Sequence, residues 1–384
     1  MATRCRRIAR ALLAASILAL TACGEGTPGT PTGVARFTTL DFADVANYSA
    51  PPLPEYFDQT VAALDSGPAV DDKVATLGRV LFYDMRLSTN DRVSCATCHQ
   101  QAFGFTDPMR FSNGISNAAT TDAHSMRLAN LRYWQPGTAF WDRREANLET
   151  QTSQPLHSLV EMGWGGAAGD IGDLTAKMRA TDYYPDLFAW AYGSSAITEP
   201  RIQRALAHFI RAMVSSSSRW DEGYALAFSP DAPDRALSAD LANFTREENR
   251  GRALFMTAAA DGGAGCAACH VPPTFALAAN SRSNGLDAGE TRLFKAPSLR
   301  NVGLTGPSMH DGRFDTLAQV VEFYDRGVQA GPALDPRLRQ GAAPLRLNLT
   351  AADRAALVAF LHTLTDEAFI ADERFSDPFR RAPR

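Results

Sequence analysis

The sequence predicts a mostly α-helical protein organised as two similar units in tandem. Its apolar residues recur with the 3.6-residue period of a helix, and glycine and proline are spread among the predicted loops. A five-residue motif, Cys-Ala-Thr-Cys-His at 95–99, returns as Cys-Ala-Ala-Cys-His at 266–270. The two copies divide the chain into comparable halves, and a length of 384 residues allows two domains.

The repeated pattern, C-x-x-C-H, is the attachment signature of c-type haem. Two thiols three positions apart can both reach the vinyl groups of one porphyrin, and the following histidine can bind the iron. A zinc site does not require a histidine directly after both cysteine pairs, and a redox dithiol needs only one pair. The sequence therefore predicts two covalently bound haem c groups and two tandem cytochrome c-like haem domains. The predicted attachment and iron-binding residues are Cys95, Cys98, His99, Cys266, Cys269 and His270.

Residues 1–23 are predicted to be a lipoprotein signal peptide. Arginines precede an apolar run at 11–20, which is too short to span a bilayer. Leu-Thr-Ala-Cys at 20–23 resembles a lipobox, which predicts a lipid anchor at Cys23; an ordinary secretory peptide is the alternative. Gly24 after the cysteine favours the outer membrane. We therefore expect a periplasmic, lipid-anchored protein that touches the membrane only through this anchor.

The rest of the chain is predicted to form a tether at 24–50 and two haem domains. The N-terminal domain is expected at 51–235, and the C-terminal domain, with a C-terminal extension, at 236–384. The formal net charge of −4 excludes a nucleic-acid-binding protein on gross electrostatics.

Three helices have clear sequence signals. A short helix at 77–83 leads towards the first haem motif, and a helix at 201–214 carries one apolar stripe. A third helix is expected at 351–365, because Thr350 and Asp353 can form a capping box at its start.

Two histidines and one long segment are expected to face solvent. His208 lies opposite the apolar stripe of its helix, and His362 lies off the stripe of its own. Residues 326–346 are rich in glycine and proline and predict a long surface loop.

Several further short motifs follow one another in a distinctive order. They are Leu-Gly-Arg-Val-Leu-Phe-Tyr-Asp at 77–84, Phe-Trp-Asp-Arg-Arg at 140–144, Val-Glu-Met-Gly at 160–163, Ala-Pro-Ser-Leu-Arg-Asn-Val at 296–302 and His-Asp-Gly at 310–312. Together with the haem motifs they resemble the bacterial di-haem cytochrome c peroxidase family, which includes a MauG-like branch. The resemblance covers nearly the whole chain after the tether.

The resemblance implies roles around the first haem. That haem would be the peroxidatic one, with His99 as its proximal ligand and the opposite face of the iron free for hydrogen peroxide. Glu161 matches the family's distal acid–base residue, which would move a proton between the two peroxide oxygens. Burial should raise its pKa. Gln151 and Pro155 match residues that flank this pocket, and Trp141 matches a tryptophan between the two haems.

Around the second haem the resemblance implies an electron-entry site with His270 as proximal ligand and His310 near the haem rim. Tyr324 stands where most members place a methionine ligand and MauG-like members a tyrosine. Its place on the inward face of a helix that ends at Gly327 agrees with ligation, which would lower the potential of this haem. Met309 is the competing ligand.

Besides Tyr324, the sequence departs from the family pattern at two further sites. Ile115 occupies the position of a switching distal histidine, so we expect the first iron to remain open; His124 could switch instead. A calcium ion is expected from the resemblance, with Thr305 and Pro307 matching its backbone-carbonyl ligands. The family's asparagine ligand has no clear counterpart, and whether Asn130 replaces it is left open by the sequence.

The leading hypothesis is a di-haem c-type peroxidase that reduces hydrogen peroxide to water. Its electrons would come from a small periplasmic redox protein, either a cytochrome c or a cupredoxin. The alternative is a MauG-like di-haem oxidase that attacks a protein or organic substrate through high-valent iron. A di-haem electron carrier is a third hypothesis, which Glu161 and the open first haem disfavour. The family is often dimeric, so a homodimer is one expectation, although the sequence shows no interface.

Overall fold

The computed structural model describes residues 31–380, except residues 66, 117, 135–137, 277–279 and 305. The predicted signal peptide with Cys23 lies outside these residues. The prediction of a mostly helical chain is confirmed: in the described part, the one ladder of named strands joins β1 (Arg339–Gln340) to β2 (Ala343–Pro344). No helix in this part has the length and apolar character needed to cross a membrane.

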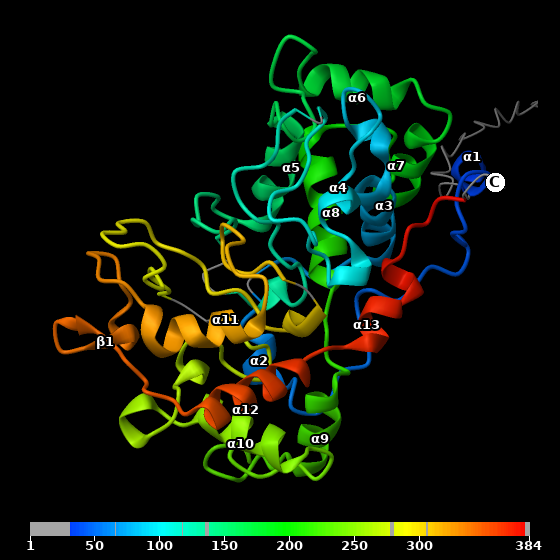
Figure 1. The fold of residues 1–384 in the computed structure, drawn as a ribbon. Coiled ribbons are helices and arrows are strands. Elements are labelled where there is room, and N and C mark those ends of the chain that lie inside the picture. The colour runs from blue at the N-terminus through cyan, green and yellow to red at the C-terminus, as the bar shows by residue number, and fades with distance from the viewer. Residues whose placement is uncertain are drawn as a thin grey trace, which may run out of the picture.

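Short α-helices build the fold. In chain order they are α1 (Thr32–Ala35), α2 (Gln59–Ala62), α3 (Asp72–Tyr83), α4 (Cys95–Cys98), α5 (Leu148–His157), α6 (Ile171–Arg179), α7 (Tyr184–Tyr192), α8 (Glu199–Ala212), α9 (Arg219–Ala227), α10 (Arg246–Met256), α11 (Leu317–Glu322), α12 (Ala351–His362) and α13 (Glu367–Ala371). Helices α3 to α8 form one part, the upper one in Figure 1, and α9 to α12 form the other. This two-part organisation agrees with the prediction of two tandem domains.

The first part is centred on the crossing of α3 and α8. Helix α3 begins after Asp71, whose side chain accepts hydrogen bonds from the backbone N–H groups of Lys73 and Val74. The helix therefore starts earlier than the predicted residue 77. At Gly78 an added Cβ would lie 2.0 Å from the backbone oxygen of Ala205 in α8. A side chain here would force the two helices apart.

The second part repeats this arrangement with α10 and α12. At Gly251 an added Cβ would lie 1.9 Å from the backbone oxygen of Ala356. Gly78 and Gly251 each open the same pattern, Gly-Arg-x-Leu-Phe, and each of these helices precedes a C-x-x-C-H motif. The internal repeat is therefore longer than the haem motif alone.

Segments from each half of the chain pack in the other part. Tyr56 lies in the second core with Trp220, whereas Phe369 and Phe375 from the C-terminal segment lie in the first core.

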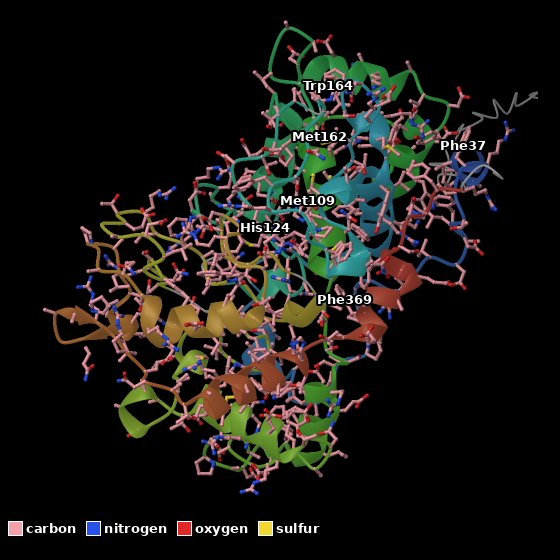
Figure 2. All side chains as sticks on the ribbon, in the orientation of Figure 1. Phe37, Met109, His124, Met162, Trp164 and Phe369 are labelled. Carbon is pink, nitrogen blue, oxygen red and sulfur yellow. The ribbon has the colours of Figure 1, made fainter. Side chains whose placement is uncertain are left out.

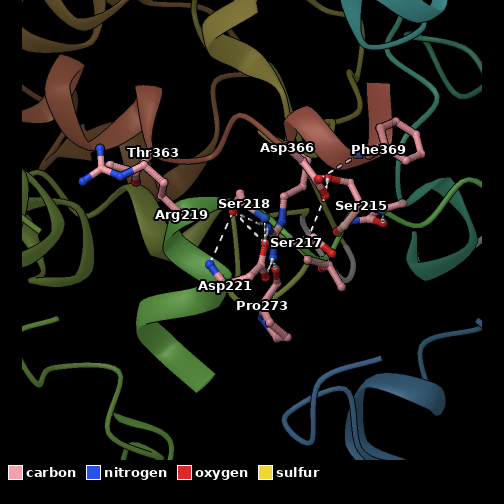
Figure 3. Close-up of polar contacts among 12 residues, drawn as sticks. Ser215, Ser217, Ser218, Arg219, Asp221, Pro273, Thr363, Asp366 and Phe369 are labelled. Carbon is pink, nitrogen blue, oxygen red and sulfur yellow. Dashed lines mark hydrogen bonds and ion pairs between the residues drawn. The ribbon is translucent and has the colours of Figure 1, made fainter. Parts of the chain in front are cut away.

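A polar network fixes the connection between α8 and α9 (Figure 3). The Asp366 carboxylate accepts hydrogen bonds from the hydroxyl of Ser215 (2.8 Å) and the N–H of Ser217 (2.9 Å). The boundary at residue 235 stays a prediction.

The helix predicted at 201–214 is α8, and its histidine shows that one expectation was wrong. His208 is fully buried, and its Nδ1 accepts a hydrogen bond of 2.9 Å from the N–H of Asp71. The polar face of α8, on which His208 lies, is covered by the start of α3. The third helix, predicted at 351–365, is α12, and its capping box of Thr350 and Asp353 is confirmed.

The predicted exposure of His362 is confirmed. The surface loop predicted at 326–346 was wrong in part, because Val328 and Leu334 are buried in a small cluster with Leu286 and Phe323. The strands β1 and β2 lie in the same segment. Glycine and proline mark its turns correctly, but they do not reveal that its few apolar residues fold inward.

Candidate functional site

A cavity of about 280 Å³ lies on the side of the first haem motif and is walled by both halves of the chain. It brings together most of the predicted site residues. From the first half it is lined by Cys95, Cys98, His99, Trp141, Gln151, Pro155 and Glu161, and from the second half by Arg292, Phe294, Lys295 and His310.

Local contacts around the first haem motif orient its histidine. Helix α4 begins with a reciprocal capping box between Ser94 and Thr97, and His99 follows directly after the helix. The Nδ1 atom of His99 lies 2.9 Å from the backbone oxygen of Phe105. Because a carbonyl can only accept, Nδ1 carries the proton and Nε2 is left as a metal ligand. Burial lowers the pKa of His99, which favours the neutral, ligating form.

The second haem motif repeats this arrangement. Nδ1 of His270 lies 3.3 Å from the backbone oxygen of Phe275 and 3.1 Å from that of Pro297. Burial lowers the pKa of His270 to about 4. No group of three or more histidine, cysteine, aspartate or glutamate side chains among the described residues could hold a metal ion. The paired thiols and the oriented imidazole of each motif fit a covalently attached haem.

Glu161 lies on the cavity wall after α5, close to the first haem motif. Its N–H donates to the hydroxyl of Ser158 (3.2 Å), while its carboxylate has no hydrogen-bond partner in the described part of the chain. Burial raises the pKa of Glu161; the Arg144 guanidinium opposes this rise and the Asp122 carboxylate adds to it. Gln151 and Pro155 project from α5 into the same cavity. His157, at the end of α5, instead pairs with Glu199 at 2.7 Å.

Trp141 lies where the two halves of the chain meet. Its indole N–H donates to the backbone oxygen of His124 (2.7 Å), and its own carbonyl accepts from the N–H of Lys295 in the second half (2.8 Å). The nearby Arg143 side chain donates to the backbone oxygen of Ser281 (2.9 Å). The loop that carries Trp141 is thus fastened to both halves.

His124 is buried at the same junction (Figure 2). Its Nδ1 lies 3.2 Å from the backbone oxygens of both Met109 and Arg110, and its Nε2 lies 3.2 Å from the hydroxyl of Thr106. These contacts hold the imidazole on the cavity wall. Ile115, at the position of the absent switching histidine, donates its N–H to the backbone oxygen of Val160, next to Glu161 (2.8 Å).

Both candidate ligands for the second haem meet at one side chain. The amide nitrogen of Asn284 lies 3.4 Å from the Tyr324 hydroxyl and 3.4 Å from the Met309 sulfur. Tyr324 lies in a π-helical turn, Phe323–Gly327, that continues α11 and ends at Gly327 as predicted. Burial raises the pKa of Tyr324 to about 12; the Asn284 hydrogen bond opposes the rise, and the Cys269 thiol adds to it. The Tyr324 hydroxyl is therefore within electrostatic range of the Cys269 thiol of the second haem motif.

Two of the remaining predicted residues, His310 and Asn130, make other contacts in the described part of the chain. His310 stacks on Phe294, with ring centroids 4.2 Å apart, and lines the first cavity. Thr305 lies outside the described residues, so a calcium site with Pro307 stays a prediction. The Asn130 amide is engaged twice by the backbone of Ser215, at 2.9 and 3.1 Å.

Sequence reasoning missed Lys295 as a cavity residue. The chain contains only three lysines, and this one stands between Phe294 and Ala296, directly before the Ala-Pro-Ser-Leu-Arg-Asn motif. A lysine in an apolar sequence context, in a chain that otherwise uses arginine, was the available signal.

Comparisons with known proteins agree with this geometry. A family model described as di-haem cytochrome c peroxidase matches residues 72–226. The methylamine utilization protein MauG of Methylorubrum extorquens is 32% identical over 318 residues, which are 79% of this chain and 80% of that protein. Cytochrome c551 peroxidase of Nitrosomonas europaea is 28% identical over 77% of this chain and 80% of its own length.

A solved structure of similar fold supports the same assignment. It is a MauG-like protein associated with microbial copper homeostasis, and it matches with a TM-score of 0.64 at 30% identity. The match covers 87% of this chain and 98% of the other. The two haem motifs, the shared cavity and these relatives show that this chain is an oxidoreductase of the di-haem cytochrome c peroxidase family.

Proposed function

We propose that this protein reduces hydrogen peroxide to water at the cavity beside Cys95, Cys98 and His99. The observation that carries the proposal is Glu161, whose carboxyl group lies on the wall of that cavity without a hydrogen-bond partner among the described residues. Such a group is free to exchange a proton with a bound molecule, which a carboxylate already used in a structural ion pair is not.

The bound haem would supply a redox-active iron to which peroxide can bind and through which electrons arrive. Reduction of hydrogen peroxide consumes two electrons and two protons, breaks the O–O bond and yields two waters. Glu161 would accept the proton of the oxygen nearer the iron and deliver it to the departing oxygen. Gln151 and Pro155, on α5, would limit the space around the peroxide.

Trp141 would carry electrons between the two haems, and its bonds to both halves support this role because they fix its position. The electron donor would be a small cytochrome c or cupredoxin. In this proposal the protein acts in the periplasm, where a lipid on Cys23 would hold it at the outer membrane. A calcium ion at Thr305 and Pro307 and a homodimer complete the proposed assembly.

Replacement of Glu161 by glutamine tests the catalytic proposal. Glu161→Gln keeps the size of the side chain but cannot accept the proton, so kcat/KM for peroxide should fall by about 10²- to 10⁴-fold. The assay is steady-state oxidation of a reduced small cytochrome c, after a pyridine haemochrome measurement of two haems per chain. Glu247→Gln, at an exposed glutamate of α10, is the matched control and should keep full activity. Equal activity of both variants would refute the role of Glu161.

A second candidate function, oxidation of a protein or organic substrate as in a MauG-like enzyme, is favoured by Tyr324. A buried phenol oxygen beside the second haem motif could bind its iron and stabilise oxidised states. Slow turnover with reduced cytochrome c, although two haems are bound and peroxide changes the optical spectrum, would favour this candidate.

The ligand itself can be identified by two variants. If Tyr324 binds the iron, Tyr324→Met should raise the potential of the second haem, because thioether sulfur stabilises ferric iron less than phenolate oxygen does. Met309→Leu should then leave the optical spectrum unchanged. The opposite pair of results would assign the ligand to Met309.

A further inference from the structure

Lys295 is a buried lysine at the junction of the two halves. It is 6% exposed, and its N–H donates to the backbone oxygen of Trp141 (2.8 Å). Its ammonium lies 4.7 Å from the ring centroid of Trp134, and the side chain lines the cavity of the first haem motif. The backbone bond and the ring contact fix both ends of the side chain, so the charge is held at one place on the wall.

Among the described arginine and lysine side chains that line this cavity, Lys295 alone lacks a carboxylate partner. Four arginines also line the cavity, and each has a carboxylate partner. The pairs are Arg132–Asp65 (2.6 Å), Arg144–Asp142 (2.8 Å), Arg211–Asp65 (3.3 Å) and Arg292–Glu290 (2.7 Å). Lys295 has no carboxylate partner among the described residues, and its ammonium makes no hydrogen bond there.

A buried ammonium without a counter-ion is costly. Burial lowers the pKa of Lys295 to about 7. Without an anion beside it, the amine is therefore only partly protonated at neutral pH. The contact with Trp134 offsets part of the cost, because a cation over an indole face contributes about 0.5–2 kcal/mol. An anion bound in the cavity would neutralise the charge of the Lys295 ammonium.

We propose that Lys295 is the cationic partner of a propionate carboxylate of the haem attached at Cys95 and Cys98. This inference rests on the proposed function, because it requires that haem in the cavity. A c-type haem always carries two propionates, whereas peroxide is neutral at physiological pH, so a propionate suits a fixed ammonium better than the substrate does. Lys295 is then a positioning residue, which orients the cofactor and adds a positive charge beside it.

The added charge has a measurable consequence. Reduction places one more negative charge on the haem, and a nearby ammonium stabilises the reduced form. Lys295→Met should therefore lower the equilibrium constant for reduction of the first haem by at least tenfold. For a one-electron couple this corresponds to a midpoint potential that is lower by about 59 mV. Lys295→Arg, which keeps the charge, should retain most of the original potential. Lys295→Gln is a neutral polar replacement in case the methionine variant does not fold.

The experiment is a spectroelectrochemical titration of the full-length holoprotein. Lys73→Met is the matched control, since Lys73 also lies over a tryptophan, 5.5 Å from the ring centroid of Trp190, but outside the cavity. It should leave the potential unchanged. Trp134→Phe removes the indole and keeps the ammonium, so it should also leave the potential nearly unchanged.

The outcomes separate this inference from the proposed function. If the unaltered protein binds fewer than two haems, the proposed function fails. If two haems are bound and the neutral variants of Lys295 keep the original potential, the inference alone is overturned. It is also overturned if Trp134→Phe shifts the potential as much as Lys295→Met, because Lys295 would then act through ring packing.

Discussion

The pH dependence of peroxide reduction should report the charges around Glu161. The ordinary pKa of a glutamate is about 4.3, and burial raises that of Glu161. Only the ionised carboxyl can accept the first proton, so kcat/KM should fall as the pH drops through this raised pKa. Asp122→Asn removes a negative neighbour and should move the acid limb to lower pH. Arg144→Met removes a positive neighbour and should move it to higher pH.

The opposite signs of these two shifts make the prediction specific. Both residues line the cavity, and each variant changes the charge by one unit, so a general disturbance of the cavity would move both limbs in the same direction. Loss of Arg144 also frees the Asp142 carboxylate, which adds to the expected upward shift. Stopped-flow or steady-state profiles of kcat/KM against pH are the measurement. Shifts of equal sign would contradict a role for the Glu161 carboxylate.

At the residue scale, local spacing was enough for the haem motifs but not for the cavity. The cysteines and histidines could be predicted because their chemistry depends on neighbours within five positions. Glu161 emerged only through a resemblance, since nothing in its own loop distinguishes it from a surface glutamate. Lys295 and the burial of His208 were missed because both depend on contacts with residues far away in the sequence, Trp141 and Asp71.

At the element scale, the two helix crossings should be sensitive to a single methyl group. Gly78→Ala and Gly251→Ala would each push a Cβ against a backbone oxygen of the facing helix, at 2.0 and 1.9 Å. Overpacking of this kind costs about 1–3 kcal/mol, against a gain of at most about 1 kcal/mol from helix propensity. We expect both variants to lower the thermal midpoint of the holoprotein.

Gly172→Ala is the matched control in α6. Gly172 is exposed, and the added Cβ would approach only the side-chain oxygen of Asp170. This variant should be neutral or slightly stabilising. Thermal unfolding followed by circular dichroism is the measurement. Midpoints for Gly78→Ala and Gly251→Ala equal to that of Gly172→Ala would show that the helices can separate at no cost.

Helix starts could be predicted where a capping box was recognised, whereas the start of α3 was predicted too late in the chain. The capping boxes of α12 and α11 follow from residues three positions apart, Thr350 with Asp353 and Thr316 with Gln319. The π-helical turn that carries Tyr324 could not be predicted, because apolar spacing assumes an α-helix throughout. The repeat Gly-Arg-x-Leu-Phe was visible in the sequence, yet its meaning depends on the facing helices α8 and α12.

At the scale of the whole molecule, two tandem parts follow from the repeated motif, whereas their interlocking does not. Tyr56 packs in the second core, and Phe375 packs in the first core. The Tyr83 hydroxyl also donates to the backbone oxygen of Phe375 (2.5 Å). Such contacts join residues that are hundreds of positions apart, and no local pattern encodes them. Separate expression of the two halves would therefore cut through both cores.

The buried ion pair of Asp221 and Arg300 offers a test of this interlocking. Arg300 is fully buried, bonds both carboxylate oxygens of Asp221 and donates to the backbone oxygen of Pro273 (2.6 Å), three residues after His270. Figure 3 shows the Asp221 side chain and Pro273 in this network. The Tyr56 hydroxyl donates to the same carboxylate (2.6 Å). One carboxylate thus joins the early chain, α9 and the loop that follows His270.

Asp221→Asn should destabilise the protein by about 3–5 kcal/mol, because it leaves the Arg300 guanidinium buried without its counter-charge. Asp240→Asn is the control: Asp240 also pairs with a buried arginine, Arg252, but its own carboxylate is exposed, so its loss should cost within about 1 kcal/mol. Urea unfolding of the holoprotein, followed by circular dichroism and by the haem spectrum, measures both. If this carboxylate joins the two halves of the chain, Asp221→Asn should lower the urea midpoint of the circular dichroism signal and that of the haem spectrum together. Unfolding of Asp221→Asn at the urea concentration of the control would mean that the apolar contacts across the two cores suffice without it.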